Sequence, residues 1–239
     1  MTLVHRTTLG LALGLAIYAT PAAVASAADK PCLLIPMDAR QTDHLRAYGI
    51  VYSALRRGEH VNWLLQYRGG SFLLPDRKHT LKDADSRGVS VERISTAGVR
   101  SLRADSLGTE AKLVELTRAP RLTALSMGAY LLVDNPVLRA CEYAGIPVKE
   151  IQEGEILEGG LGDAEWLGIP HFDFTGQQGR FWAKYPQFPA YQQQHSDGLA
   201  MAREHGFSKT PPFHAAVART IRDHIAQGLC VFAMCSGTE

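Results

Sequence analysis

The segment CVFAMCSGTE, residues 230–239, places a short apolar run directly before a cysteine and a turn of small residues. This pattern is typical of a nucleophile elbow, where a buried strand turns sharply into a helix. Ala233 and Gly237 flank Cys235, and bulkier residues there would collide with the returning backbone. A thiol at a helix N-terminus is also favoured as the thiolate. We therefore expect Cys235 to be a nucleophile, the alternative being a small buried apolar side chain.

The preceding chain alternates short apolar runs with amphipathic stretches. An apolar run at 33–37 is followed by a helical pattern over 41–57 and a second apolar run at 61–65. Later apolar runs are expected as strands at 72–74, 89–94, 122–127, 148–151, 166–169 and 229–234, with helices at 136–144, 190–206 and 212–227. This alternation predicts an α/β fold with a doubly wound, mostly parallel sheet.

The two ends of the chain carry further expectations. Residues 1–27 combine a short start containing Arg6, an apolar stretch at 9–19 and the small residues Ala25-Ser26-Ala27, which is typical of a signal peptide. An uncleaved anchor is the alternative, but the apolar stretch is shorter than the roughly 20 residues that span a bilayer. We expect a periplasmic or secreted protein without membrane contact after cleavage. The domain 28–239 is expected to be a C-terminally truncated fragment, because no helix follows its last strand.

Composition excludes several classes of protein. The chain has 25 basic and 24 acidic side chains, so nothing indicates a nucleic-acid partner. The hydrophobic content of 46% is ordinary for a globular domain. The 4 cysteines show no CxxC spacing, which argues against a zinc site. In an oxidising compartment Cys32 and Cys230 are candidates for a disulfide, because both open an apolar run and would lie at one end of a parallel sheet.

Polar residues follow four of the expected strands. In an open parallel sheet, ligands bind beyond the carboxyl ends of the strands, so we expect these residues to share one rim. The catalytic candidates there are Cys235, His171 and Asp173. The substrate-binding candidates are Asp38, Arg68, Gly69, Gly70, Thr175 and Gly176.

Several of these candidates also have structural interpretations. Asp38 suits a purely structural role, as a helix cap or turn residue, as well as it suits a binding role. The sequence Arg68-Gly69-Gly70 suits either a tight turn or an anion site built from backbone amides. His171 and Asp173 share a face if their segment is extended; they would then orient each other, ligate a metal with a third residue, or satisfy a loop. No metal is expected.

Four segments of the chain resemble a secreted bacterial family of the class I glutamine amidotransferase-like superfamily, whose members are often labelled "asparagine synthetase B". They are LLIPMDARQTDHLRAYGI (33–50), VNWLLQYRGGSFLLPD (61–76), HFDFTGQQGRF (171–181) and VFAMCSGTE (231–239). The resemblance implies a flavodoxin-like sheet and, in active members, an elbow cysteine partnered by a histidine and an acid further along. Only Cys235 can be matched, since those partners would follow Glu239.

These observations predict an exported, Cys-dependent hydrolase or acyl transferase acting on a small amide or ester. Cys235 would attack the carbonyl, elbow amides and those of Gly69 and Gly70 would hold the oxyanion, and His171 is a candidate base. No glycine-serine-rich pyrophosphate loop for ATP is found in the sequence, and no cofactor is expected. The alternative is a non-catalytic domain of the same fold that binds a carbohydrate or peptide.

Overall fold

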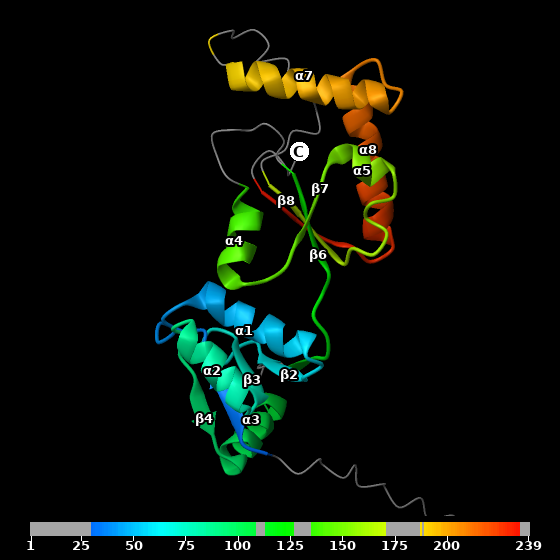
Figure 1. Ribbon diagram of the computed structural model, residues 1–239. Helices are drawn as coiled ribbons and strands as arrows, with labels where there is room; N and C mark the ends of the chain where they lie inside the picture. Colours follow the sequence, from blue (N-terminus) through cyan, green and yellow to red (C-terminus); the bar gives the residue numbers. More distant parts are fainter. Residues whose placement is uncertain (1–29, 109–112, 127–134, 171–186, 188, 235–239) are drawn as a thin grey trace, which may run out of the picture.

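The structure, a computed structural model, describes residues 30–108, 113–126, 135–170, 187 and 189–234, and these form two lobes, each built around its own sheet (Figure 1). The first lobe contains β1 (Cys32–Ile35), α1 (His44–Arg56), β2 (Val61–Leu64), β3 (Ser71–Pro75), α2 (Lys78–Ser86), β4 (Glu92–Ile94), α3 (Thr96–Gly108) and β5 (Leu113–Leu116). The second contains β6 (Leu122–Leu125), α4 (Pro136–Ala144), β7 (Lys149–Ile151), α5 (Glu153–Leu157), β8 (Trp166–Ile169), α7 (Pro189–Glu204), α8 (Thr210–Ala226) and β9 (Cys230–Ala233).

The first lobe, called the antiparallel lobe below, has a sheet with the strand order β4-β1-β3-β2-β5 among the described residues. Every neighbouring pair is antiparallel. Residues of α1 and α2 share one core cluster with Leu33 and Ile35, while Leu102 of α3 packs against Leu34 on the other face. The strands β1 to β4 therefore form two split βαβ units, the ferredoxin-like arrangement.

The expected parallel sheet is wrong for this half of the chain. The segment 65–70 joins β2 to β3, and it is too short for a parallel crossover, which needs about a dozen residues. These two strands therefore pair as an antiparallel hairpin. Because β1 and β2 are both antiparallel to β3, which lies between them, they run in the same direction.

The second lobe, called the parallel lobe below, has the strand order β7-β6-β8-β9 among the described residues, and every pair is parallel. The prediction of a parallel sheet is confirmed here. Phe213 and Val217 of α8 and Ile156 of α5 pack on one face together with Leu167 of β8. On the other face α4 packs Val137 and Cys141 against β6, as part of a smaller cluster.

The ends of α4 illustrate how local sequence sets an element. The side chain of Asn135 accepts hydrogen bonds from the backbone N–H groups of Val137 and Leu138, at 3.1 and 3.3 Å, and Pro136 occupies the first turn. At the other end Gly145 adopts a left-handed conformation with φ 69°, which terminates the helix. The expected helix at 136–144 is thereby confirmed.

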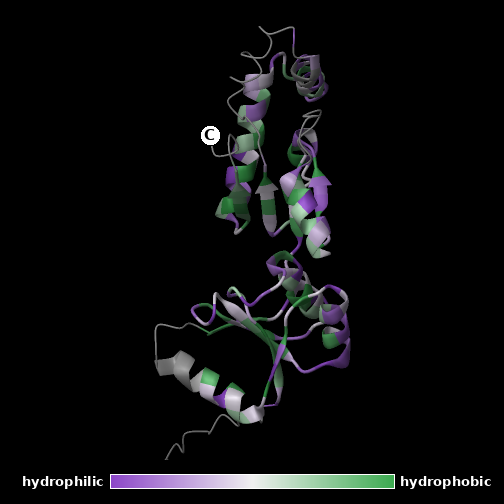
Figure 2. Ribbon diagram, turned by 90° about the vertical axis from the view of Figure 1, so that its left-hand side faces the viewer, coloured by the Kyte–Doolittle hydropathy of each residue, from purple (hydrophilic) through white to green (hydrophobic). Residues whose placement is uncertain are grey.

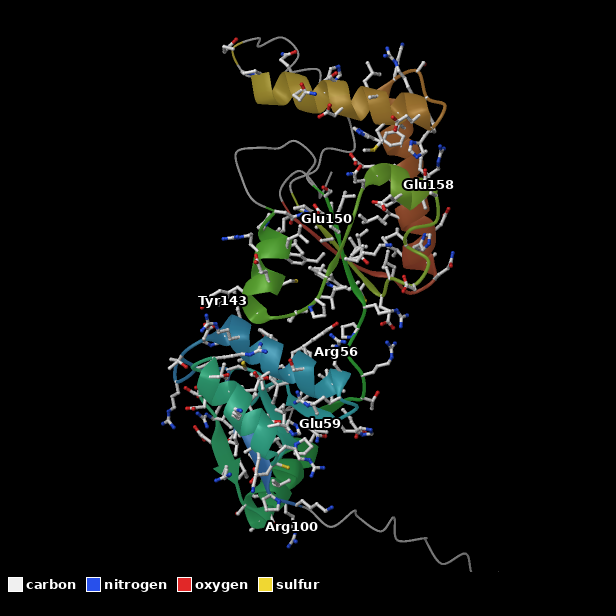
Figure 3. All side chains as sticks on the ribbon, viewed as in Figure 1. Arg56, Glu59, Arg100, Tyr143, Glu150 and Glu158 are labelled. Atoms are coloured by element: carbon white, nitrogen blue, oxygen red, sulfur yellow. The ribbon has the colours of Figure 1, made fainter. Side chains whose placement is uncertain are left out.

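The two lobes are joined by residues 117–121 and by a contact between α1 and α4. Figure 1 shows α1 on the side of the antiparallel lobe that faces α4, and Figure 2 shows the same two lobes one above the other from the side. Nη1 of Arg87 donates a hydrogen bond of 3.0 Å to the carbonyl oxygen of Ala144. The hydroxyl of Tyr143, labelled in Figure 3, donates to Oδ2 of Asp43 at 2.6 Å.

The cysteines contradict the expected disulfide. Cys32 lies in β1 between β3 and β4, whereas Cys230 opens β9 beside Trp166. Their strands belong to different sheets, so the proposed bridge between Cys32 and Cys230 is wrong. Cys230 is a free thiol, as is the buried Cys141. None of the described helices combines the length and apolarity needed to cross a membrane.

Candidate functional site

Two of the sequence-predicted site residues, Asp38 and Arg68, lie together in the antiparallel lobe. Asp38 follows β1 and Arg68 follows β2, and the parallel direction of these strands brings their carboxyl ends to the same edge. Nε of Arg68 donates to Oδ2 of Asp38 at 2.8 Å. Its two terminal nitrogens donate to the carboxylate oxygens of Glu92 in β4, at 2.8 and 3.0 Å. The three residues form an ion cluster, with a bidentate pair as its strongest contact.

The turn that carries Arg68 is tightly constrained. Arg68 has φ 47°, and among the described residues no other non-glycine residue has a positive φ. Gly69, with φ 78°, lies against the end of β1, where a β carbon would come within 2.3 Å of the carbonyl oxygen of Met37. The N–H of Met37 also donates to the carbonyl oxygen of Arg68 at 3.1 Å. The turn therefore needs glycine for its backbone approach, and the ion cluster fixes Arg68 in an unusual conformation.

The charges of the cluster stabilise one another. The hydrogen bond from Arg68 holds the pKa of Asp38 below its usual value, and another does the same for Glu92. These two carboxylates in turn raise the pKa of Arg68, with the Glu92 hydrogen bonds as the larger cause. Oδ1 of Asp38 also accepts from the N–H of Arg40 at 3.1 Å, so Asp38 is a turn residue as well as an ion-pair partner. The ion cluster therefore links the segment after β1, the turn between β2 and β3, and β4.

We expect Arg68→Ala to lower the free energy of unfolding by about 1–2 kcal/mol at pH 7, because two carboxylates lose their partner. A carboxyl with a lowered folded-state pKa stabilises the fold above its unfolded pKa, near 4, and this contribution is lost as pH falls through the folded value. Urea unfolding should therefore show a steeper acid loss in the wild type than in Arg68→Ala. Arg93→Ala is the matched control, because the Arg93–Asp76 pair at 3.3 Å leaves Arg93 66% exposed. Equal losses of unfolding free energy in the two variants would contradict a stabilising role for the ion cluster.

The expected single rim is wrong, because the chain starts a new sheet at β6. Asp38, Arg68, Gly69 and Gly70 belong to the edge of the antiparallel lobe, and Figure 1 shows β6 running away from that lobe. Gly69 and Gly70 lie in the turn between β2 and β3, two strands of a different sheet from β9, the strand that precedes Cys235.

The remaining predicted site residues, His171, Asp173, Thr175, Gly176 and Cys235, lie outside the described residues. The strands that lead to them are described. Beyond the strand pairing itself, the N–H of Met234 donates to the carbonyl oxygen of Ile169 at 2.9 Å. The strands β8 and β9 thus end side by side and in the same direction. One residue separates Ile169 from His171, and Met234 directly precedes Cys235.

Sequence reasoning missed two acidic residues. Glu92 lies inside an expected strand, and only the pairing of β4 with β1 brings it to Arg68. Glu153 begins α5 directly beyond the carboxyl end of β7, and burial raises its pKa. A half-buried carboxyl at the carboxyl edge of a parallel sheet holds its proton at a higher pH than usual, which suits acid or base chemistry. Glu153 follows closely after the apolar run at 148–151, and this position in the sequence could have marked it as a candidate site residue.

Within the described ranges no group of three or more His, Cys, Asp or Glu side chains is arranged to hold a metal ion. Comparison of the chain with known protein families, curated proteins and solved structures finds no match.

Proposed function

We propose that the protein is an exported, amidotransferase-like hydrolase or acyl transferase that uses Cys235 as its nucleophile on a small amide or ester. The observation that carries the proposal is the position of β9: it ends a parallel sheet, and its ladder with β8 continues to Met234, the residue before the cysteine. Ligands of such sheets bind beyond the carboxyl ends of the strands. In chain order the strands stand 2-1-3-4, which supports a flavodoxin-like arrangement.

The proposed reaction proceeds in two steps. The Cys235 thiolate attacks the carbonyl carbon, and backbone amides at the turn after β9 stabilise the oxyanion. The proposed base, His171, takes the proton of the thiol and gives it to the leaving amine or alcohol as the thioester forms. Water, or an acceptor nucleophile, then attacks the thioester, releases the acyl group and restores the thiol. His171 is proposed as the local base, because the strand that precedes it is the neighbour of β9.

A second candidate function, binding of a carbohydrate without catalysis, is favoured by an aromatic pair. The rings of Trp166 and Phe232 stack with centroids 6.3 Å apart and an interplanar angle of 16°. Phe232 is 51% exposed, on the face of β9 opposite to α8. Exposed aromatic rings of this kind suit the apolar face of a sugar ring.

The test of the hydrolase proposal is thiol reactivity. At pH 7 we expect iodoacetamide to alkylate Cys235 at least about tenfold faster than Cys230, because the free backbone amides of an elbow favour the thiolate. Cys230 is the matched control, since it lies at the other end of β9 and is exposed. Cys141 should react slowest, because burial raises its pKa. Mass spectrometry of the cysteine peptides over a pH series gives the rates.

A second measurement separates the two candidate functions. A chromogenic acetyl ester should acetylate Cys235 in the wild type and in Cys230→Ser, and Cys235→Ser should lose this reaction. Equal alkylation rates of Cys235 and Cys230, or ester turnover that survives in Cys235→Ser, would reject the hydrolase. Quenching of tryptophan fluorescence by soluble oligosaccharides, removed by Phe232→Ala, would then support the carbohydrate-binding function.

A further inference from the structure

His205 occupies the corner between α7 and α8, and its ring is enclosed by three elements. Its side chain is 17% exposed. A β carbon on Gly154, at the start of α5, would lie 2.5 Å from Cε1 of His205, so the glycine leaves the space that the ring fills. The ring of Phe213, in α8, lies at a centroid distance of 5.6 Å. The imidazole thus fits a hollow made by α5 and α8 at the end of α7.

Both ring nitrogens of His205 meet hydrogen-bond acceptors. Nδ1 lies 2.8 Å from the carbonyl oxygen of Met201, and Nε2 lies 3.2 Å from Oε1 of Glu158. A neutral imidazole carries one N–H, so it can satisfy only one of these acceptors, whereas the imidazolium donates to both. The geometry therefore fits the protonated ring. Figure 3 labels Glu158, the C-cap residue of α5, beside this corner.

The position at the end of a helix favours the same charge. Gly206 has φ 81°, and the N–H of Phe207 donates to the carbonyl oxygen of Ala202 at 2.8 Å, which closes α7 with a Schellman turn. A cation at a helix C-terminus is stabilised by the helix dipole. Among the other titratable groups of the three elements, Glu204 in α7 acts on His205 through its charge. Glu153 directly precedes Gly154 in α5, and His214 lies next to Phe213 in α8.

We propose that His205 is a pH-operated clamp, which holds the corner of α7 and α8 on α5 when its imidazole is protonated and releases it when the ring is neutral. The clamp is independent of the chemistry proposed for Cys235. The hydrogen bond to Met201 and the Glu158 carboxylate raise the pKa of His205, with Met201 as the larger cause. A raised histidine pKa stabilises the fold below the unfolded value, near 6.5, and this stabilisation is lost as pH rises through the folded value.

Hydrogen exchange of the intact protein tests the clamp. After correction for the intrinsic pH dependence of amide exchange, α7 peptides should open about two- to tenfold more between pH 6 and pH 8.5. His205→Gln should remove this response. His224→Gln is the matched control, because His224 makes the same bond to the carbonyl four residues earlier, Thr220, at 2.8 Å, but meets no carboxylate within the described residues. It should behave as the wild type.

A second measurement protects the test if His205→Gln unfolds. Nitrogen chemical shifts of the His205 ring should show both nitrogens protonated at pH 6, and Glu158→Gln should lower the midpoint of the titration. A neutral ring at pH 6, an unchanged midpoint in Glu158→Gln, or the same exchange response in His205→Gln as in the wild type would overturn the clamp.

Discussion

The Gly49→Ala variant should unfold with about 1–3 kcal/mol less free energy than the wild type, although alanine is the better helix former by about 1 kcal/mol. Gly49 lies in α1, at the point where the C-terminal end of α4 packs against this helix. A β carbon at this position would overlap the carbonyl oxygen of Ala144 and come within 3.2 Å of Nη1 of Arg87. The obstacle is backbone held by a hydrogen bond from Arg87, so it cannot turn aside as a flexible side chain would.

Gly198→Ala is the control for this experiment. Gly198 also lies within a helix, α7, but the nearest atom to its added β carbon is Cγ2 of Thr210 at 3.7 Å, an ordinary contact. This variant should gain up to about 1 kcal/mol from helix propensity. Chemical denaturation gives both values, and small-angle scattering of Gly49→Leu should show the lobes further apart. If both alanine variants were stabilised, the contact of α1 with α4 would not exist in solution.

The contact of α1 with α4 also connects the edge of the antiparallel lobe that carries the ion cluster with the parallel lobe. Asp43, the N-cap of α1, accepts the Tyr143 hydroxyl of α4, and the Arg46 guanidinium lies over the Tyr143 ring at 4.6 Å from its centroid. The hydrogen bonds from Arg46 and Tyr143 hold the pKa of Asp43 below its usual value. The helix α1 therefore has two neighbours of interest. It follows β1, the strand that leads to the ion cluster, and it contacts α4 of the parallel lobe.

The sequence pattern located most elements but could not pair the strands of the first half. The expected helix at 41–57 contains α1, and the runs at 33–37, 61–65 and 72–74 overlap β1, β2 and β3. Hydrophobic periodicity reports which side of an element is buried and carries no information on its partner. The pattern therefore could not predict that β3 pairs between β1 and β2, and so it could not predict the antiparallel sheet.

The second half was predicted better because its connections leave fewer choices. Each pair of consecutive strands is separated by at least one helix, and such crossovers favour parallel pairing. The short α5, Glu153–Leu157, was missed because five residues are too few for a periodic signal. Residues 96–120 are the least regularly patterned part of the sequence, yet they contain α3 and β5.

The candidate site was predictable only where strand direction alone decides the neighbour. Asp38 and Arg68 were expected at one rim, and they meet because β1 and β2 run in the same direction. Their common partner Glu92 depends on the pairing of β1 with β4, two segments far apart in the sequence. The roles of His171 and Cys235 remain proposals that rest on the strands β8 and β9.

The Phe213→Ala substitution should lower the free energy of unfolding of the parallel lobe by about 3–5 kcal/mol and leave that of the antiparallel lobe unchanged. Phe213 is fully buried, and its ring contacts Phe207 at a centroid distance of 5.7 Å. Each lobe has its own core clusters, and in the described residues the main contact between the lobes, besides the linker, is that of α1 with α4. Separate cores unfold separately when the contact between them is small.

Urea unfolding followed by hydrogen exchange tests this expectation. In Phe213→Ala, peptides of β6, β8 and α8 should open at low urea while those of β1 and β3 stay protected. Phe232→Ala is the matched control in the same lobe, because its ring is 51% exposed and its removal should cost less than about 1 kcal/mol. A single transition that includes both lobes in Phe213→Ala would mean that the contact of α1 with α4 is strong enough to make them one cooperative unit, and Gly49→Ala should then destabilise both lobes together.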